Sequence, residues 1–83
     1  MIDKKQLTDT IISIANSLDD NFSLVSSAQD TFSKMAIDSL GFVKLLVGIE
    51  ERYQFEFDER DLDLSKYHTI EDLITTTYKY VNI

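Results

Sequence analysis

The sequence predicts a small all-α domain, a four-helix bundle with three main helices, one short helix and a long first loop. Apolar residues recur at helical spacing in three separate segments. Pro is absent and Gly occurs only twice, which disfavours both disorder and a turn-rich β architecture. With 83 residues, of which 43% are hydrophobic, the chain is expected to form a single domain over residues 1–83 with one small core.

The first helix is predicted over residues 7–18, where five apolar residues share one helical face. These are Leu7, Ile11, Ile14, Ala15 and Leu18. Residues 19–34 are rich in Ser, Asp, Asn and Thr and show no sustained period, which predicts a long loop. Loops of this length tend to serve function or to pack on themselves. Four apolar side chains are therefore expected to pin the loop to the core: Phe22, Leu24, Val25 and Phe32.

The second helix is predicted to begin after Asp38, because an Asp at this position can accept the free backbone N–H groups of a first turn. Ser39 then lies in that first turn. One apolar stripe of this helix is expected to face the core: Phe42, Leu45, Leu46, Ile49 and Tyr53. A second stripe lies to one side and comprises Leu40, Val43 and Val47. A domain this small does not easily bury both, so the second stripe is either an exposed docking surface or further core.

Gly48 interrupts the second helix, where it costs about 1 kcal/mol relative to Ala. We interpret it as permitting a close approach by the core, by a partner or by a bound cargo.

Residues 54–66 form a predicted connector in which apolar residues alternate with acids, with one short helix around residues 59–64. A β-strand over residues 53–57 is the alternative, although it has no evident pairing partner. The last helix is predicted to begin after Thr69, which forms a capping-box-like pair with Asp72. Helical spacing then continues through Ile70, Leu73, Ile74, Thr77, Tyr78 and Val81.

Composition narrows the classes of function. The lack of Cys excludes a disulfide framework, a thiolate zinc site and a cysteine nucleophile, so the cytoplasm is the expected location. No apolar run has the length of a signal-peptide core or of a membrane span. The net charge of -7 and the dispersed basic residues argue against nucleic acid and favour basic protein partners, although solubility alone would also account for the charge.

The sequence shows no conventional catalytic set or metal site. A set built from His68, Ser39 and Asp38 lacks a G-x-S-x-G elbow, and an Asp next to the Ser is poorly placed to orient the His. His68 is therefore expected to be a loop or cap residue. An acidic run lacks the Gly and the Glu that an EF-hand requires, and we interpret it as a solvated face. This run consists of Asp58, Glu59, Asp61 and Asp63.

The segment that leads into the second helix carries the most informative motif. It has a Phe upstream, then apolar residues, then Asp-Ser-Leu at the helix start, and its members are Phe32, Met35, Ile37, Asp38, Ser39 and Leu40. This pattern resembles that of the acyl and peptidyl carrier protein family. The resemblance covers nearly the whole chain, continuing through Val43, Leu45, Ile49, Glu50, Glu51, Tyr53 and Phe57 and then Thr69, Ile70, Leu73 and Ile74.

The resemblance implies that the fold is a bundle of the acyl-carrier type and that Ser39 carries 4'-phosphopantetheine from coenzyme A, with acyl groups held on it as thioesters. A phosphodiester at this position would meet the N–H groups and the positive dipole end of the helix. Asp38 would help to engage the phosphopantetheinyl transferase. The second helix would recognise partners through Leu40, Val43, Lys44, Val47, Glu50 and Glu51.

The implied protein is a monomer and not an enzyme. It would serve as a cosubstrate for the transferase, for a loading enzyme and for downstream synthases or transferases.

Three positions depart from the family pattern. Ala36 stands where Gly is usual, Gly41 where fatty-acid carriers commonly have an acid, and Lys44 replaces an acid on the recognition helix. The positive charge of Lys44 would weaken docking to a basic partner, which favours a discrete carrier of a polyketide, nonribosomal peptide or related pathway over a housekeeping fatty-acid carrier. An aminoacyl carrier, for example one loaded with D-alanine by an adenylating enzyme, is one alternative. A helical adaptor with no covalent arm is the alternative of another class.

Overall fold

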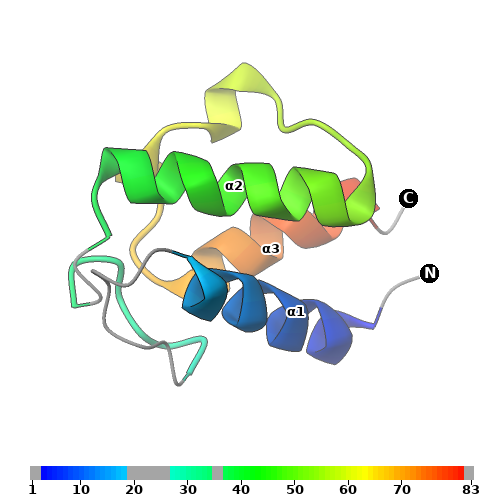
Figure 1. Ribbon diagram of the computed structural model, residues 1–83, viewed down its shortest axis with the longest axis horizontal. Coiled ribbons are helices and arrows are strands. Elements are labelled where there is room, and N and C mark those ends of the chain that lie inside the picture. Colours follow the sequence, from blue (N-terminus) through cyan, green and yellow to red (C-terminus); the bar gives the residue numbers. More distant parts are fainter. Residues whose placement is uncertain (1–2, 19–26, 35–36, 82–83) are drawn as a thin grey trace.

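The computed structural model describes residues 3–18, 27–34 and 37–81, and in this part of the chain all regular structure is helical. Three α-helices, α1 (Lys4–Ser17), α2 (Ser39–Tyr53) and α3 (Ile70–Val81), are joined by loops, and two single 3-10 turns, η1 (Glu59–Asp61) and η2 (Leu64–Lys66), lie between α2 and α3 (Figure 1). The predicted all-α class is confirmed. The one short helix expected around residues 59–64 is replaced by the two turns.

The two turns form because the connector has two capping residues close together. The Asp58 side chain accepts the Arg60 N–H (3.2 Å), and the Asp63 side chain accepts the Ser65 N–H (3.0 Å). Each cap begins its own turn, so the second cap interrupts the helix that the first one starts. The alternative of a strand over residues 53–57 is wrong, because Tyr53 is still helical and residues 55–58 are irregular.

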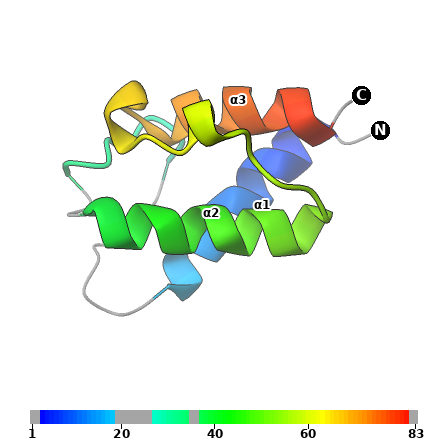
Figure 2. The same cartoon turned by 90° about the horizontal axis from the view of Figure 1, so that it is seen from above.

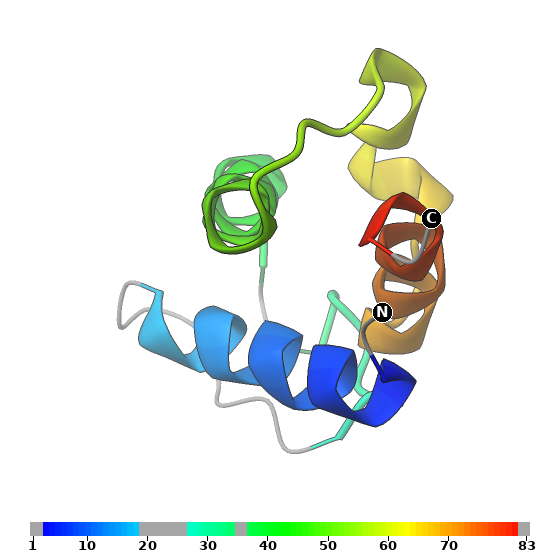
Figure 3. The same cartoon turned by 90° about the vertical axis from the view of Figure 1, so that its right-hand side faces the viewer.

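The three α-helices enclose one core. α2 and α3 run in the same general direction, α1 crosses both obliquely on one side, and the connector lies on the other side (Figures 2 and 3). α1 contacts both other helices. The core contains most of the predicted stripes, and its fully buried apolar members are Leu7, Ile11, Phe42, Leu45, Leu46, Ile49, Ile70, Leu73 and Ile74.

The two apolar stripes of α2 differ in burial, which decides whether the second stripe is core or surface. Tyr53 is half-buried at the end of the inward stripe, whose other four members are buried. Leu40, Val43 and Val47 remain 64%, 49% and 44% exposed. The second stripe is therefore surface and not core.

The described part of the first loop is tied to the start of α3. The Phe32 N–H donates to the His68 carbonyl (3.1 Å), and the Phe32 ring is buried edge-on against Phe42 at 5.6 Å. The prediction that Phe32 pins the loop is confirmed, whereas Phe22, Leu24 and Val25 lie outside the described residues.

The predicted cap of α3 is also confirmed. The Asp72 carboxylate accepts the Thr69 N–H (3.1 Å), while the Thr69 hydroxyl accepts the Asp72 N–H (3.3 Å). The same carboxylate oxygen accepts the His68 N–H (2.8 Å), so His68 belongs to the turn that precedes the helix. These N–H groups lower the pKa of Asp72, with His68 making the largest contribution.

Candidate attachment site

Ser39 is the first residue of α2, and its side chain is exposed. Asp38 caps the helix as predicted: its Oδ1 accepts the Gly41 N–H (2.9 Å), and its carbonyl accepts the Phe42 N–H (2.9 Å). The start of a helix presents backbone N–H groups and the positive end of the helix dipole, which favour an anion. The site therefore combines an accessible primary hydroxyl with an environment suited to a phosphate. Met35 and Ala36, which precede it in the motif, lie outside the described residues.

A groove of about 390 Å³ begins beside Ser39. Ser39, Phe42 and Val43 of α2 form one wall, and the opposite wall is residues 62–65 of the connector, namely Leu62, Asp63, Leu64 and Ser65. The Asp63 carboxylate accepts both the backbone N–H (3.0 Å) and the hydroxyl (2.8 Å) of Ser65, which together lower its pKa. Sequence reasoning placed these four residues in a connector and missed their part in the groove. The alternation of Leu62 and Leu64 with polar residues was the sequence signal that one side of this segment is apolar, and in the structure both leucines line the groove opposite α2.

The exposed stripe of α2 continues along the helix from the Ser39 end. We call Leu40, Val43 and Val47 the α2 strip; Lys44 and Glu51 are exposed on the same helix. Leu62 of the connector is 43% exposed and shares the groove with Val43, so the apolar surface extends beyond α2.

Glu50 differs from the other predicted partner-facing residues. Its Oε2 accepts the Phe57 N–H (2.8 Å), and the side chain is half-buried. The carboxylate therefore holds the start of the connector against α2, whereas Glu51 next to it is exposed.

Gly48 lies where α1 passes α2. A Cβ atom at this position would lie only 2.8 Å from Ile14 Cγ2, which is shorter than real Cβ contacts. Of the three roles considered for this glycine, the close approach is that of another core helix.

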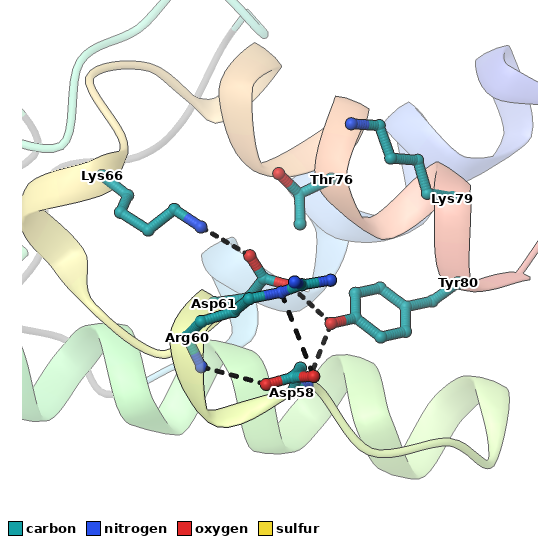
Figure 4. Close-up of a pocket in the computed structure, with 7 residues that line it drawn as sticks. All are labelled: Asp58, Arg60, Asp61, Lys66, Thr76, Lys79 and Tyr80. Carbon is teal, nitrogen blue, oxygen red and sulfur yellow. Dashed lines mark hydrogen bonds and ion pairs between the residues drawn. The ribbon is translucent and has the colours of Figure 1, made fainter.

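A second hollow, of about 690 Å³, lies away from Ser39 between the connector and α3, and charged side chains line it (Figure 4). Its centre is Asp61, which is only 8% exposed. Lys66 Nζ lies 2.7 Å from Asp61 Oδ1, and the Tyr80 hydroxyl donates to Asp61 Oδ2 at 2.5 Å. These two bonds lower the pKa of Asp61 and outweigh the opposing effect of burial.

The interpretation of the acidic run as a solvated face is therefore wrong for Asp61. The burial of Asp61 could not be predicted from the local sequence, because the partners that make it favourable, Lys66 and Tyr80, lie five and nineteen residues further along the chain. Asp58, Glu59 and Asp63 are exposed, as expected. Within the described residues, no group of three or more His, Cys, Asp or Glu side chains could hold a metal ion.

Within the described residues, His68 forms no hydrogen bond or ion pair with Ser39 or Asp38. Its backbone groups bond to Phe32 and Asp72. The three residues therefore do not form a hydrolase-type set there. Among the described helices, none is long and apolar enough to cross a membrane.

Comparison with known proteins identifies the family. No curated protein and no solved structure matches the chain. A protein-family description, the phosphopantetheine attachment site, matches residues 6–76 and thus most of the chain, including most of α1, all of α2 and the connector, and the first half of α3. The chain therefore belongs to the phosphopantetheine-attachment family, carrier proteins of the acyl and peptidyl type with 4'-phosphopantetheine as their prosthetic group.

Proposed function

We propose that Ser39 Oγ is the attachment point of the phosphopantetheine arm. The observation that carries the proposal is an exposed Ser hydroxyl at the first residue of α2, beside a capping Asp38, within the matched residues. In the reaction, a bond forms between Ser39 Oγ and the phosphorus of the phosphopantetheine moiety of coenzyme A, and the pyrophosphate bond of coenzyme A breaks. Adenosine 3',5'-bisphosphate leaves, and a base on the transferase takes the hydroxyl proton. The phosphodiester anion then lies at the positive end of the α2 dipole.

The arm supplies a thiol that this Cys-free chain does not have among its own side chains. Cargo is held on that thiol as a thioester, and the bond-making chemistry belongs to the partner enzymes. In this proposal the protein is a monomeric cytoplasmic cosubstrate and not a catalyst.

The α2 strip is the proposed surface for the transferase, the loading enzyme and the downstream enzymes. Exposed apolar residues beside charged ones have the composition of a docking surface. Leu40 and Val43 lie close to Ser39 along the helix, so a bound partner would also reach the arm. Asp38 has one oxygen in the cap, and its exposed carboxylate is available to the transferase.

Lys44 and Gly41 support a carrier of a specialised biosynthetic pathway, of the polyketide or nonribosomal peptide kind. Lys44 is exposed on the proposed docking helix and places a positive charge there, in a protein of net charge -7. A partner that fits this helix needs an acidic or neutral group opposite Lys44. Gly41 is a buried residue of the first turn, and it leaves this turn without the acid that is common there in fatty-acid carriers.

Intact-mass spectrometry tests the attachment. The protein is incubated with coenzyme A, magnesium and a broad-specificity phosphopantetheinyl transferase, and one phosphopantetheine adduct is expected. Ser39→Ala should abolish it, whereas Ser65→Ala, which removes a hydroxyl from the opposite wall of the same groove, should leave it intact. An adduct that persists in Ser39→Ala would disprove the assignment. Absence of any adduct on the wild type would instead favour the adaptor alternative.

The holo form then separates the two carrier alternatives. Acyltransferases and adenylating enzymes with their respective substrates are offered to the holo protein, and the thioester is sought by mass. An acyl adduct supports the acyl carrier, and an aminoacyl adduct supports the alternative of an amino acid carrier such as one for D-alanine.

A further inference from the structure

The two walls of the groove beside Ser39 are held in different ways. The α2 wall is part of a helix that is anchored in the core by Phe42 and Leu46. The opposite wall, residues 62–65, has Leu62 exposed and Leu64 only half-buried. Its backbone bonds are local: the Leu62 N–H donates to the Glu59 carbonyl (3.1 Å), the Lys66 N–H to the Asp63 carbonyl (3.1 Å) and the Tyr67 N–H to the Leu64 carbonyl (3.0 Å). None of these bonds attaches the wall to the rest of the fold.

The attachment of this wall comes instead from the residues at its two ends. Asp61 lies directly before residues 62–65 and Lys66 directly after them, and the ion pair between these two side chains (2.7 Å) joins the two ends of the segment. Tyr80 of α3 donates to the other oxygen of Asp61 (2.5 Å) and so ties the closed segment to that helix (Figure 4). We call Asp61, Lys66 and Tyr80 the Asp61 staple.

A further bond reinforces the staple from within the core. The Tyr67 hydroxyl donates to the Asp61 carbonyl (2.8 Å), and the Tyr67 ring is buried against Phe42 with ring centroids 5.4 Å apart. Phe42 also lines the groove from the α2 side. Both walls are therefore positioned against the ring of Phe42, the α2 wall directly and the outer wall through Tyr67. Both bonds to the Asp61 carboxylate, from Lys66 and from Tyr80, are charge-assisted and therefore stronger than the neutral bond from Tyr67, so together they are the contacts most able to keep the outer wall in one place.

The groove matches the part of the arm that would lie nearest to Ser39. After its phosphate, phosphopantetheine has a dimethyl-substituted carbon and then two amides. The apolar side chains of Val43, Leu62 and Leu64 suit the dimethyl group. The Asp63 carboxylate and the Ser65 hydroxyl, at the same wall, offer hydrogen-bonding groups to an amide.

We propose that the Asp61 staple positions the outer wall of the groove beside Ser39, and thereby determines how closely the arm lies against Val43 and Leu62. This inference rests on the proposed attachment at Ser39. Asp61, Lys66 and Tyr80 are positioning residues here, because they line a different hollow and act on the arm only through residues 62–65.

Lys66→Met is the variant that tests the proposal with least risk to folding, because the Lys66 side chain is 44% exposed while Asp61 is nearly buried. Lys79→Met is the matched control: Lys79 lines the same hollow, but within the described residues it forms no hydrogen bond or ion pair with Asp61. Lys66→Arg keeps a cation that can pair with Asp61, so this variant should behave like the wild type.

Two NMR measurements on these variants give the answer. In the apo protein, amide hydrogen exchange at Leu62 and Tyr67 should be about tenfold faster in Lys66→Met, because the loss of a charge-assisted bond makes local opening easier. On attachment of the arm, amide shifts of Val43, Leu62 and Ser65 should change in the wild type. In Lys66→Met these shift changes should fall to less than half, and in Lys79→Met and Lys66→Arg both measurements should match the wild type.

Several results would overturn the inference. Unchanged exchange in Lys66→Met would show that the ion pair does not hold the wall. Faster exchange with full arm-induced shifts would show that the wall does not position the arm. Normal adduct formation with no shift change at the groove in the wild type would refute the inference while leaving the proposed function intact. Absence of an adduct by mass would refute both.

Discussion

Gly48 offers a direct test of how α1 and α2 meet. Its missing side chain lets Ile14 of α1 approach so closely that a Cβ atom would lie 2.8 Å from Ile14 Cγ2. Gly48→Ala therefore has two opposing effects. Ala is the better helix former by about 1 kcal/mol, but the new methyl group overpacks the helix crossing, which typically costs about 1–3 kcal/mol. The net expectation is a loss of stability of up to about 2 kcal/mol.

A double-mutant cycle separates the two effects. Ile14→Ala removes the γ carbon that the new methyl would meet, so in that background Gly48→Ala should stabilise the protein by about 1 kcal/mol. Ile14→Val is the matched control, because Val keeps both γ carbons and loses only the terminal methyl. The clash should therefore persist in Ile14→Val.

Urea unfolding of the single and double variants measures these free energies. The cycle with Ile14→Ala should give a coupling energy of about 1–3 kcal/mol, and the cycle with Ile14→Val should give much less. Equal effects of Gly48→Ala in the wild-type and Ile14→Ala backgrounds would refute the close approach. So would a full gain of about 1 kcal/mol from Gly48→Ala alone.

Three further outcomes are expected. The Thr77 hydroxyl is fully buried without a hydrogen-bond partner in the described part of the chain, so Thr77→Val should stabilise the protein by about 1 kcal/mol and raise Tm by about 4–8 °C. Calorimetry measures this change in Tm, with Thr75→Val as the control at an exposed site, where stability should change by less than about 0.5 kcal/mol. A lower Tm in Thr77→Val would contradict the prediction. Asp38→Ala should lose about 1 kcal/mol of cap energy and slow arm attachment, whereas Asp38→Asn should keep the stability but still slow attachment; an Asn variant modified at the wild-type rate would show that the charge is not recognised. The folded-state pKa of Asp61 is lowered, so its contribution is complete above the unfolded-state value of about 3.9 and is lost as pH falls through the folded value. Stability measured from pH 7 downwards should therefore decrease in acid, and the decrease should be shallower in Asp61→Asn than in the wild type.

Local signals predicted much of the fold. Helical spacing located all three α-helices, and the caps at Asp38 and at Thr69 with Asp72 identified where α2 and α3 begin. These features depend on residues within one turn of each other, which is why sequence spacing suffices. The motif around Ser39 is the same kind of local pattern, so the proposal that Ser39 is the attachment point could be made from the sequence.

The remaining features depend on residues that are distant in sequence. The spacing of Leu40, Val43 and Val47 showed a second stripe, but its exposure depends on which faces α1 and the connector cover. Likewise, Asp61 reads as one acid in an acidic run, and its burial becomes favourable because Lys66 of the connector and Tyr80 of α3 bond to its two carboxylate oxygens. The two capping carboxylates of the connector, Asp58 and Asp63, lie five residues apart, and this spacing produces two separate turns in place of the one short helix predicted from the sequence.

The two walls of the groove beside Ser39 differ in burial. On the α2 side, the wall residue Phe42 is a buried core residue, so a substitution of Phe42 that changes this wall also changes the stability of the domain. On the connector side, Leu62 is exposed and Leu64 is half-buried, so substitutions there can reshape the groove at little cost in stability. This requires that Asp61 and Lys66 keep the segment closed. If Ser39 carries the arm as proposed, variation in how the arm lies in the groove is expected to arise in residues 62–65, with the α2 strip unchanged.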